Sequence, residues 1–273
     1  MIRLPFVKMH GTGNRILIVD NRDAAAAAPD EATLRRLGDS ATGPGFDQLM
    51  WLCASDRDDA VAAYRVFNAD GSEVEQCGNG LRCVAWLMAK DGDPEFTLSS
   101  PAGPVSARVA SADDVAVSMG RPVFRPDRIP FIAEQEAPRY RIEVGSDSIE
   151  ASALSMGNPH LVIDVDDIDT APVAELGPAL ETHARFPERT NVGFAQFLER
   201  DRIALRVFER GVGETLACGT GACAAVVSGI RRGLLNESVE VTVPGGKLMV
   251  SWRGDDAWLS GRVTLEDEGS IDL

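Results

Sequence analysis

Two stretches of the chain decide its fold: RVFNADGSEVEQCGNG at residues 65–80 and RVFERGVGETLACGTG at residues 206–221. Both begin with Arg-Val-Phe, carry a glutamate at the same position and end with Cys-Gly-x-Gly, at an offset of 141 residues. A Gly-Asn that leads into apolar residues at 13–20 returns at 157–164, and a Pro-x-Gly follows each Cys-Gly-x-Gly at similar spacing. Three blocks in the same order, at nearly the same offset, predict two related halves.

Each half carries the same succession of expected elements. A strand follows the Gly-Asn, a second strand ends before a glycine-bearing turn, and helix-forming residues follow the Cys-Gly-x-Gly. The helices are expected at residues 81–90 and 222–231. Valine-rich strands fill the rest, so each half is mostly β with one central helix, which is an α+β class. We expect the halves to be residues 1–119 with 263–273, and residues 120–262.

The composition excludes several classes of function. The chain has 273 residues, and its formal net charge of −15 argues against nucleic acid or an anionic membrane as partner. No apolar run approaches the roughly 18 residues of a membrane span. The first ten residues are interrupted by Arg3, Pro5 and Lys8, so they carry no signal-peptide core. Five cysteines, an odd number, without an export signal predict reduced thiols in a cytoplasmic protein.

Cys77 and Cys218 are the candidate catalytic residues, because each stands at the expected start of a helix and is followed by glycines. The unpaired N–H groups and the positive dipole of a helix start favour an anion, and they should lower the pKa of both thiols. A carboxylate held by both helix starts would have its α-carbon between two sulfurs. A thiolate and a thiol could then act as base and acid on opposite faces and invert a stereocentre.

No cofactor and no metal are expected. The chain has three lysines, none of them in a setting that suits the Schiff base of a pyridoxal enzyme, so a cofactor-free route is the more economical interpretation. Cys53, Cys83 and Cys223 are interpreted as small buried apolar residues. The spacings from Cys77 to Cys83 and from Cys218 to Cys223 are too wide for the usual structural zinc pairs.

Longer motifs around the two cysteines resemble the diaminopimelate epimerase family. Residues 67–83, FNADGSEVEQCGNGLRC, are similar to the family's first cysteine motif, and residues 209–221, ERGVGETLACGTG, are similar to its second. Four shorter motifs agree: His10-Gly11-x-Gly13-Asn14, Gly45-Phe46-Asp47-Gln48, Gly157-Asn158-Pro159-His160 and Arg189-Thr190-Asn191-Val192. The similarity extends from about residue 6 to the C-terminus.

The resemblance implies two pseudo-symmetric domains, each a β-barrel-like sheet around a central helix, with the substrate held between them. It implies conversion of L,L-diaminopimelate to the meso isomer in lysine and peptidoglycan precursor synthesis. The expected partner is a small amino-acid substrate, with a homodimer as the assembly. One departure bears on that assembly: a tyrosine that some relatives place at the dimer interface is replaced near Glu266.

The resemblance also implies the roles of individual residues. Catalysis would depend on Cys77 and Cys218, assisted by His160 and Glu209. The backbone of Gly78, Asn79, Gly219 and Thr220 would hold the carboxylate at the reacting centre. The distal amino-acid group would be bound by Asn68, Asn158, Asn191, Glu209 and Arg210, with Asn14 and Gln48 completing the pocket. These residue types fit a distal zwitterion, which needs a guanidinium, a carboxylate and amides that both donate and accept.

Alternatives remain open at this point. Arg15 stands where relatives carry an acidic residue, and Ser40 stands where many carry arginine, which predicts the loss of one ion pair near the pocket. That departure keeps open a racemase or epimerase of the same fold that acts on another amino acid. A non-catalytic amino-acid binder would be expected to lack one or both thiols, and a thiol-redox sensor would depend on the approach of Cys77 to Cys218.

Overall fold

In the computed structural model, which describes residues 2–24, 26–90 and 92–273, the chain divides into two compact units. The first unit comprises Met1–Ser118 together with Ser260–Leu273, and the second comprises Met119–Leu259. The last strand of the chain therefore returns to the unit that holds the first.

The first unit consists of a sheet and two helices. Its strands are β1 (Arg3–Gly11), β2 (Asn14–Asp20), β3 (Gln48–Cys53), β4 (Ala62–Asn68), β5 (Glu73–Val74), β6 (Glu95–Ser100), β7 (Gly103–Ser111), β8 (Asp114–Ser118) and β18 (Thr264–Asp272), and its helices are α1 (Glu31–Gly38) and α2 (Gly78–Ala89). Neighbouring strands run in the order β18, β1, β2, β3, β4, β6, β7, β8. The pairs β2/β3 and β4/β6 are parallel and the others antiparallel.

The second unit repeats this plan. Its strands are β9 (Tyr140–Val144), β10 (Asp147–Ser155), β11 (Pro159–Asp164), β12 (Asn191–Glu199), β13 (Arg202–Glu209), β14 (Gly213–Thr215), β15 (Ser238–Val243), β16 (Gly246–Ser251) and β17 (Trp258–Gly261, which ends past the boundary), and its helices are η1 (Pro126–Arg128), α3 (Val173–Glu181) and α4 (Gly219–Arg231). The order is β9, β10, β11, β12, β13, β15, β16, with β11/β12 and β13/β15 parallel. The parallel pairs thus fall at equivalent positions in both units, which confirms the predicted repeat.

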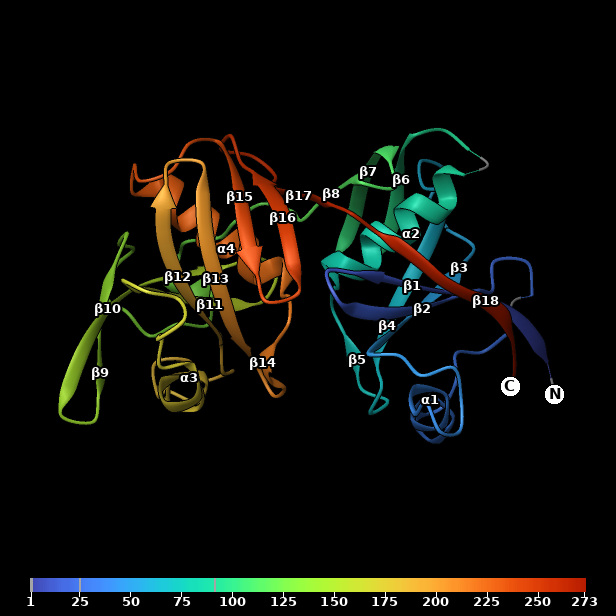
Figure 1. Cartoon of the computed structure of the whole chain (residues 1–273), viewed down its shortest axis with the longest axis horizontal. Helices are drawn as coiled ribbons and strands as arrows, with labels where there is room; N and C mark the ends of the chain where they lie inside the picture. The colour runs from blue at the N-terminus through green and yellow to red at the C-terminus, as the bar shows by residue number, and fades with distance from the viewer. Residues whose placement is uncertain (1, 25, 91) are drawn as a thin grey trace. The chain divides into compact units, whose positions relative to one another are not determined.

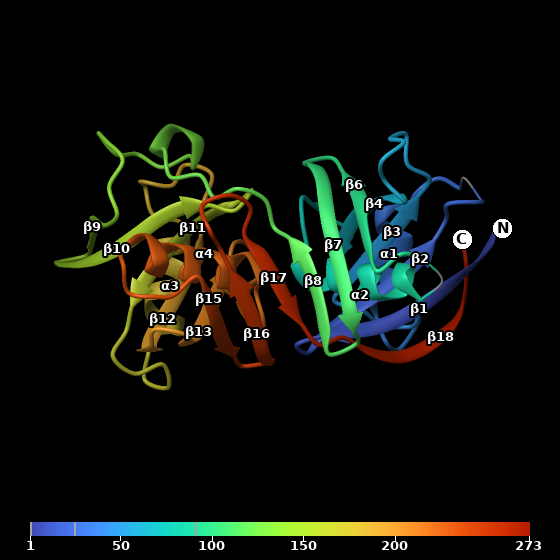
Figure 2. The ribbon, with the colours of Figure 1, turned by 90° about the horizontal axis from the view of Figure 1, so that it is seen from above.

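One helix lies at the centre of each unit. Helix α2 packs against β1, β2, β3, β7 and β8, so strands surround it on several sides (Figure 1). Helix α4 packs in the same way against β10, β11, β12, β13 and β16 (Figure 2). Strands cover most of the surface of α4, so the helix is buried from Gly219 to Gly229. Its sequence accordingly consists almost entirely of small and apolar residues. The α+β class with a helix inside a curved sheet is therefore confirmed.

An ion pair recurs beside each candidate cysteine and explains one part of the sequence repeat. Arg65 on β4 binds both carboxylate oxygens of Glu73 on β5, at 2.8 and 2.7 Å. Arg206 on β13 binds Glu214 on β14 in the same two-pronged way, at 2.6 and 2.9 Å. Each pair ties the short strand that leads to the cysteine onto the longer strand before it.

Among the described residues, no helix is both long and apolar enough to cross a membrane.

Candidate active site

Each candidate cysteine is the residue that caps its helix, as predicted. Cys77 is the N-cap of α2, with extended backbone at φ −137° and ψ 102°, and its sulfur accepts the backbone N–H of Gly80 at 3.1 Å. Cys218 is the N-cap of α4, at φ −115° and ψ 109°, and its sulfur accepts the N–H of Gly221 at 3.4 Å. Each thiol therefore occupies the place that serine or aspartate usually takes at a helix start. We call each cysteine, with the residues of its own unit around it, a half-site.

The second glycine of each Cys-Gly-x-Gly is required by packing under the thiol. A Cβ added at Gly80 would lie 2.6 Å from the Met50 sulfur and 3.3 Å from the Cys77 sulfur. A Cβ added at Gly221 would lie 2.9 Å from Val207 and 3.2 Å from the Cys218 sulfur. Only glycine allows the capping N–H to approach the sulfur while the helix stays packed on the sheet.

The first half-site surrounds Cys77 with amides. The Cys77 thiol, about 7% exposed, donates to the Asn14 Oδ1 at 3.7 Å. Gln48 on β3 donates to the Asn68 Oδ1 at 3.1 Å across the β3/β4 pair, and the Asn68 Nδ2 donates to Ser72 at 3.0 Å. The half-site thus offers neutral groups that can both donate and accept hydrogen bonds.

The second half-site places a carboxylate beside its thiol. Cys218, about 4% exposed, donates a hydrogen bond to the Glu209 carboxylate, which also accepts the Thr215 hydroxyl at 2.5 Å. The Thr220 hydroxyl lies 3.5 Å from the Cys218 sulfur and accepts the Asn158 amide at 3.5 Å. Cys218, Glu209, Thr220 and Asn158 are therefore linked by one chain of contacts.

The electrostatics of Cys218 differ from the sequence-based expectation. Burial raises the pKa of the Cys218 thiol well above its ordinary value, and the neighbouring Glu209 carboxylate raises it further. Hydrogen bonds from Thr220 and the Gly221 N–H lower the pKa of Cys218, but they are the smaller influences. Burial raises the pKa of Glu209 as well. Cys218 is accordingly a protonated thiol at neutral pH. The expectation of a lowered pKa was wrong, because burial outweighs the N–H group of the helix start.

His160 is a fully buried and neutral member of the second half-site. Its Nε2 lies 2.9 Å from the Asn158 Oδ1, so the ring fixes the orientation of that amide. Burial lowers the pKa of His160 to about 3, with a further contribution from Arg210. A histidine held neutral in this way can orient a substrate-facing amide, and it is a weak base.

The turn that carries Glu209 and Arg210 is braced by two buried side chains. The Asn191 Oδ1 accepts the Arg210 N–H at 3.0 Å, while the Asn191 Nδ2 donates to the Pro159 carbonyl at 3.0 Å. The Glu181 carboxylate, at the end of α3, accepts the Gly211 N–H at 2.9 Å. The sequence interpretation did not include Glu181. Asn191, a substrate-binding candidate, uses both ends of its side-chain amide in these two hydrogen bonds.

The departure at Arg15 has a partner within its own unit. The Arg15 Nη2 lies 2.7 Å from the Asp47 Oδ1, and its backbone N–H donates to the Asp47 Oδ2 at 2.8 Å. This exposed ion pair joins the Gly-Asn turn to the Gly45–Gln48 motif. Arg15 thus pairs with Asp47, and the loss of an ion pair between positions 15 and 40 stays a prediction.

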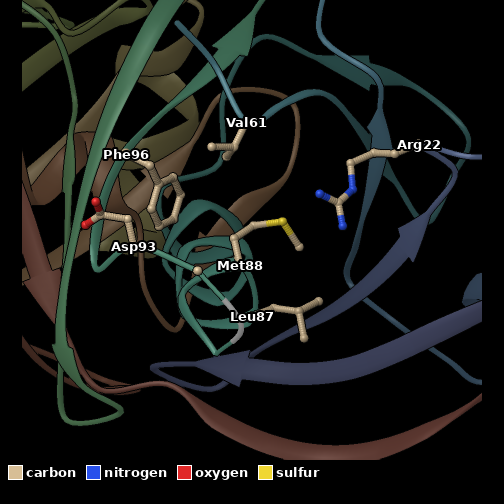
Figure 3. Close-up of a pocket in the computed structure, with 7 residues that line it drawn as sticks. Arg22, Val61, Leu87, Met88, Asp93 and Phe96 are labelled. Atoms are coloured by element: carbon tan, nitrogen blue, oxygen red, sulfur yellow. The ribbon is translucent and has the colours of Figure 1, made fainter.

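Other candidate groups lie outside the half-sites. Burial raises the pKa of Cys83 and of Cys223 to about 12, which fits their interpretation as inert apolar residues. A hollow of about 250 Å³ lies near the C-terminal end of α2, where Met88, Phe96 and Val61 form apolar walls (Figure 3). Its guanidinium, from Arg22, is already paired with Asp20 at 2.7 Å. This hollow lacks the chemistry of either half-site.

Two further polar residues near the cysteines were missed in the sequence interpretation. Thr215 donates to Glu209, and it stands in the repeated glycine-bearing turn before Cys218. Arg82 is fully buried one helical turn after Cys77. The sequence signal for Arg82 was its position between apolar neighbours, as a charged residue in a helix expected at the centre of its unit.

Comparison with known proteins agrees with these features. Residues 6–125 and 152–268 match the family model described as diaminopimelate epimerase. The diaminopimelate epimerase of Acinetobacter baumannii strain AYE is 49% identical over 275 residues, which cover 99% of this chain and 98% of that protein. That of Nitrosomonas europaea is 48% identical over 278 residues, with 100% of each chain covered.

A solved structure extends the similarity at the level of the fold. The crystal structure of a hydroxyproline epimerase from Agrobacterium vitis superposes with a TM-score of 0.70, covering 98% of this chain and 91% of that one. Its sequence identity is 16%, so the similarity concerns the arrangement of strands and helices.

Proposed function

The chain belongs to the diaminopimelate epimerase family, and on that basis we propose that it interconverts L,L- and meso-diaminopimelate without a cofactor. The single observation that carries the proposal is the capping cysteine, which occurs once in each unit at the start of a buried central helix. A repeated device of this kind supplies two proton carriers and two anion-binding helix starts, which is what a cofactor-free epimerase needs.

We propose that the two helix starts bind the carboxylate at the reacting centre. The first backbone N–H groups of a helix have no partner within it, and the helix dipole favours an anion beside them. The sulfur of each cysteine already accepts the third of these N–H groups, from Gly80 or Gly221. The preceding groups, on Gly78, Asn79, Gly219 and Thr220, are the proposed donors to the substrate carboxylate.

The proposed reaction removes one proton from the α-carbon and adds another on the opposite face. A thiolate removes the α-proton from one face of the substrate, and the electron pair of the broken C–H bond is delocalised into the carboxylate. The donors at the helix starts stabilise that developing negative charge. The thiol on the opposite face then donates its proton to the α-carbon, which inverts the stereocentre and leaves a thiol and a thiolate in exchanged roles. Cys77 and Cys218 are the proposed pair.

Glu209 is proposed to assist Cys218. A thiol that is buried and hydrogen-bonded to a carboxylate is a poor spontaneous base, because burial and the negative charge both oppose the thiolate. The same carboxylate can accept the thiol proton as the thiolate forms, since burial raises the pKa of Glu209 toward that of a useful proton acceptor. His160 is proposed to act indirectly, by orienting Asn158.

The polar residues of the two half-sites are proposed to bind the distal amino-acid group. They are Asn14, Gln48, Asn68, Asn158, Asn191, Glu209 and Arg210. The guanidinium would bind the distal carboxylate and the amides would bind the distal ammonium and carboxylate together. This set distinguishes diaminopimelate from amino acids that lack a second charged end.

The proposal includes a cellular setting. The expected role is lysine and peptidoglycan precursor synthesis in the cytoplasm, with the enzyme as a homodimer. The tyrosine that some relatives place at the dimer interface is replaced near Glu266. Sedimentation velocity across a range of concentrations measures the assembly directly.

The test of the function uses L,L-diaminopimelate in deuterated water. We expect the reduced protein, without added cofactor, to form the meso isomer and to introduce deuterium at the inverted α-carbon. Absence of both inversion and exchange with L,L-diaminopimelate, together with exchange of another amino acid such as glutamate or proline, would overturn the substrate assignment and leave the epimerase chemistry.

A further inference from the structure

Arg82 is a buried cation that the proposed mechanism leaves unused. Its side chain is fully buried on α2, and no carboxylate among the residues the structure describes forms an ion pair with it. The cost of burying a charge without a counter-charge is large, so such residues are uncommon outside functional sites. The equivalent position in the repeat, 141 residues later, is Cys223, which carries no charge.

The contacts of Arg82 converge on the start of α2. Its Nη2 donates to the Asn79 Oδ1 at 2.7 Å and to the Thr12 hydroxyl at 3.2 Å, while its Nη1 donates to the Arg262 carbonyl at 2.9 Å. The Thr12 hydroxyl in turn donates to the Asn79 Oδ1 at 3.2 Å. The Nε of Arg82 has no hydrogen-bond partner in the described residues. The guanidinium therefore clamps the Asn79 side chain from one side.

Backbone strain supports a functional reason for this clamp. Thr12, in the turn between β1 and β2, has φ of +53°, a conformation that β-branched residues rarely adopt. It is held there while its hydroxyl bridges Arg82 and Asn79. Strain of this kind persists where the surroundings enforce it, and it tends to occur at functional sites. The turn also approaches the guanidinium closely, since a Cβ on Gly11 would lie 3.0 Å from the Arg82 Nη2.

The Arg82 guanidinium acts electrostatically on Cys77. Cys83 and Tyr64 interact electrostatically with the same thiol. Burial raises the pKa of Cys83 and of Tyr64 to about 12, so both are neutral at pH 7. Two charged groups of this unit have partners of their own: Glu266 lies 3.8 Å from Lys8, and the Arg262 guanidinium lies 3.3 Å from Asp113. A further titratable residue, His10, lies next to Gly11 at the end of β1.

We propose that Arg82 is a positioning residue of the first half-site, which fixes Asn79 so that the start of α2 is shaped to bind the substrate carboxylate and which holds a buried positive charge beside Cys77. The proposal deepens the function proposed above and depends on it for the identity of the carboxylate. Arg82 does not contact the reacting atoms; it acts through Asn79 and through its field at Cys77.

The two effects of Arg82 can be separated by substitution. Arg82→Lys keeps the charge but cannot reach Asn79, Thr12 and the Arg262 carbonyl together, because lysine is a point charge on a flexible stem. Arg82→Met removes both the charge and the hydrogen bonds at similar volume. Thr12→Ala removes one contact from a turn where loss of the branched side chain relieves strain. Arg232→Met is the matched control, since it removes another largely buried arginine, which is paired with Asp164 in the second unit.

Two measurements are made on each variant, with thermal unfolding as a check of the fold. The first follows the rate of Cys77 alkylation by iodoacetamide against pH without substrate, with peptide mapping to distinguish the five cysteines. The second gives kcat and KM for L,L-diaminopimelate. We expect Arg82→Met to raise the apparent pKa of Cys77 by about one unit or more and to raise KM. Arg82→Lys should raise KM with little change in the alkylation profile, and Thr12→Ala should raise KM by a smaller factor.

The proposal can be tested whether or not Arg82→Met folds. A wild-type alkylation profile in Arg82→Met, or an equal shift in Arg232→Met, overturns the electrostatic part. Unchanged KM in both Arg82→Lys and Thr12→Ala overturns the positioning part, and these variants suffice if Arg82→Met does not fold. Failure of the wild type to epimerise diaminopimelate would overturn the proposed function instead, and the alkylation profiles would still test the role of Arg82.

Discussion

The two half-sites share one backbone plan and differ in charge. Both present a cysteine as the N-cap of a buried helix. In both, the cysteine sulfur accepts the backbone N–H of the residue three positions later. The first half-site has a buried arginine, Arg82, and a neutral Asn68 at the end of β4. The second has the uncharged Cys223 at the position of Arg82 and the carboxylate of Glu209 at the position of Asn68.

This difference shows how a duplicated unit can supply unequal proton carriers. A cation near one thiol favours the thiolate, and a carboxylate near the other favours the thiol. An epimerase needs one base and one acid at the start of each turnover, so an enzyme with two identical thiols would hold a smaller fraction of its molecules in the required state. We infer that divergence of positions 82 and 209 prepares Cys77 as the base and Cys218 as the acid in one direction of the reaction, and that Glu209 accepts the Cys218 proton when the roles are exchanged.

The largest expected effect comes from removing either thiol. Cys77→Ala and Cys218→Ala should each lower kcat by about 10⁴-fold or more, at the upper end of what a positioned acid or base contributes. The double variant should be no worse than either single one, because the two groups act as a unit. The measurement is turnover of L,L-diaminopimelate. Cys223→Ala, in the same helix as Cys218, is the control and should retain activity. Near-normal turnover in either active-site variant would exclude the two-thiol mechanism.

Loss of the Glu209 charge should separate thiol acidity from activity. The carboxylate raises the pKa of Cys218, so Glu209→Gln should lower the pH at which Cys218 is alkylated. Turnover should nevertheless fall, by about 10²-fold, because the variant has lost the acceptor for the thiol proton. Alkylation of Cys218 with peptide mapping, together with kcat, measures both effects. The alkylation profile of Cys77 should not change, and neither should that of Cys218 in Glu214→Gln, whose carboxylate pairs with Arg206.

The sequence predicted the features that the two half-sites share. Cys-Gly-x-Gly at a fixed offset indicated two helix starts, and the repeated arginine and glutamate are the ion pairs Arg65–Glu73 and Arg206–Glu214. Such features depend on local spacing, which a single chain displays. The repeat predicted boundaries after residues 119 and 262, and the structure divides after residues 118 and 259.

The features that separate the half-sites could not be predicted in the same way. The pKa of Cys218 depends on how completely the sheet buries it, and the influence of burial exceeds that of the helix start. The importance of Arg82 depends on which strands and turns close around α2, including a carbonyl 180 residues away on the return of the chain. Local motifs specify the backbone of the site, whereas tertiary burial determines its charges.

One titratable side chain, His160, is present in the second unit and has an apolar equivalent in the first. His160 on β11 occupies the place of Ile16 on β2, and burial lowers its pKa to about 3. Because the unfolded chain binds a proton near pH 6.5 and the folded chain does not, stability is complete above pH 6.5 and falls as the pH decreases toward 3. Between pH 6.5 and pH 5 His160 should therefore remove about 1.6 kcal/mol from the free energy of unfolding.

Urea unfolding of the wild type and His160→Gln at these two pH values measures this contribution. The variant should lose less stability on acidification by about that amount. Equal losses in wild type and His160→Gln would show that His160 becomes protonated in the folded state, and would remove this difference between the units.

The smallest expected effect comes from the ion pairs that the units share. Both join the short strand before the cysteine to its neighbour with two hydrogen bonds, so their geometry is equivalent. Their surroundings are not: the side chains of Arg65 and Glu73 are 44% and 43% exposed, whereas those of Arg206 and Glu214 are 26% and 33% exposed. Water screens the first pair more, and Arg206 also donates to the Ile168 and Ala171 carbonyls, at 3.3 and 3.4 Å.

We therefore expect the second pair to be the stronger, although both lie in the weak range of surface ion pairs. Double-mutant cycles with Arg65→Met and Glu73→Gln, and with Arg206→Met and Glu214→Gln, measured by urea unfolding, should give coupling free energies of about 0.3 and about 1 kcal/mol. Raising the salt concentration should reduce the first coupling more than the second, because exposed charges are screened more effectively. If the first coupling equalled or exceeded the second, solvent exposure would not account for the difference. The repeat would then set the strength of these pairs through their shared geometry alone, and the divergence between the two units would be confined to the residues that contact the thiols.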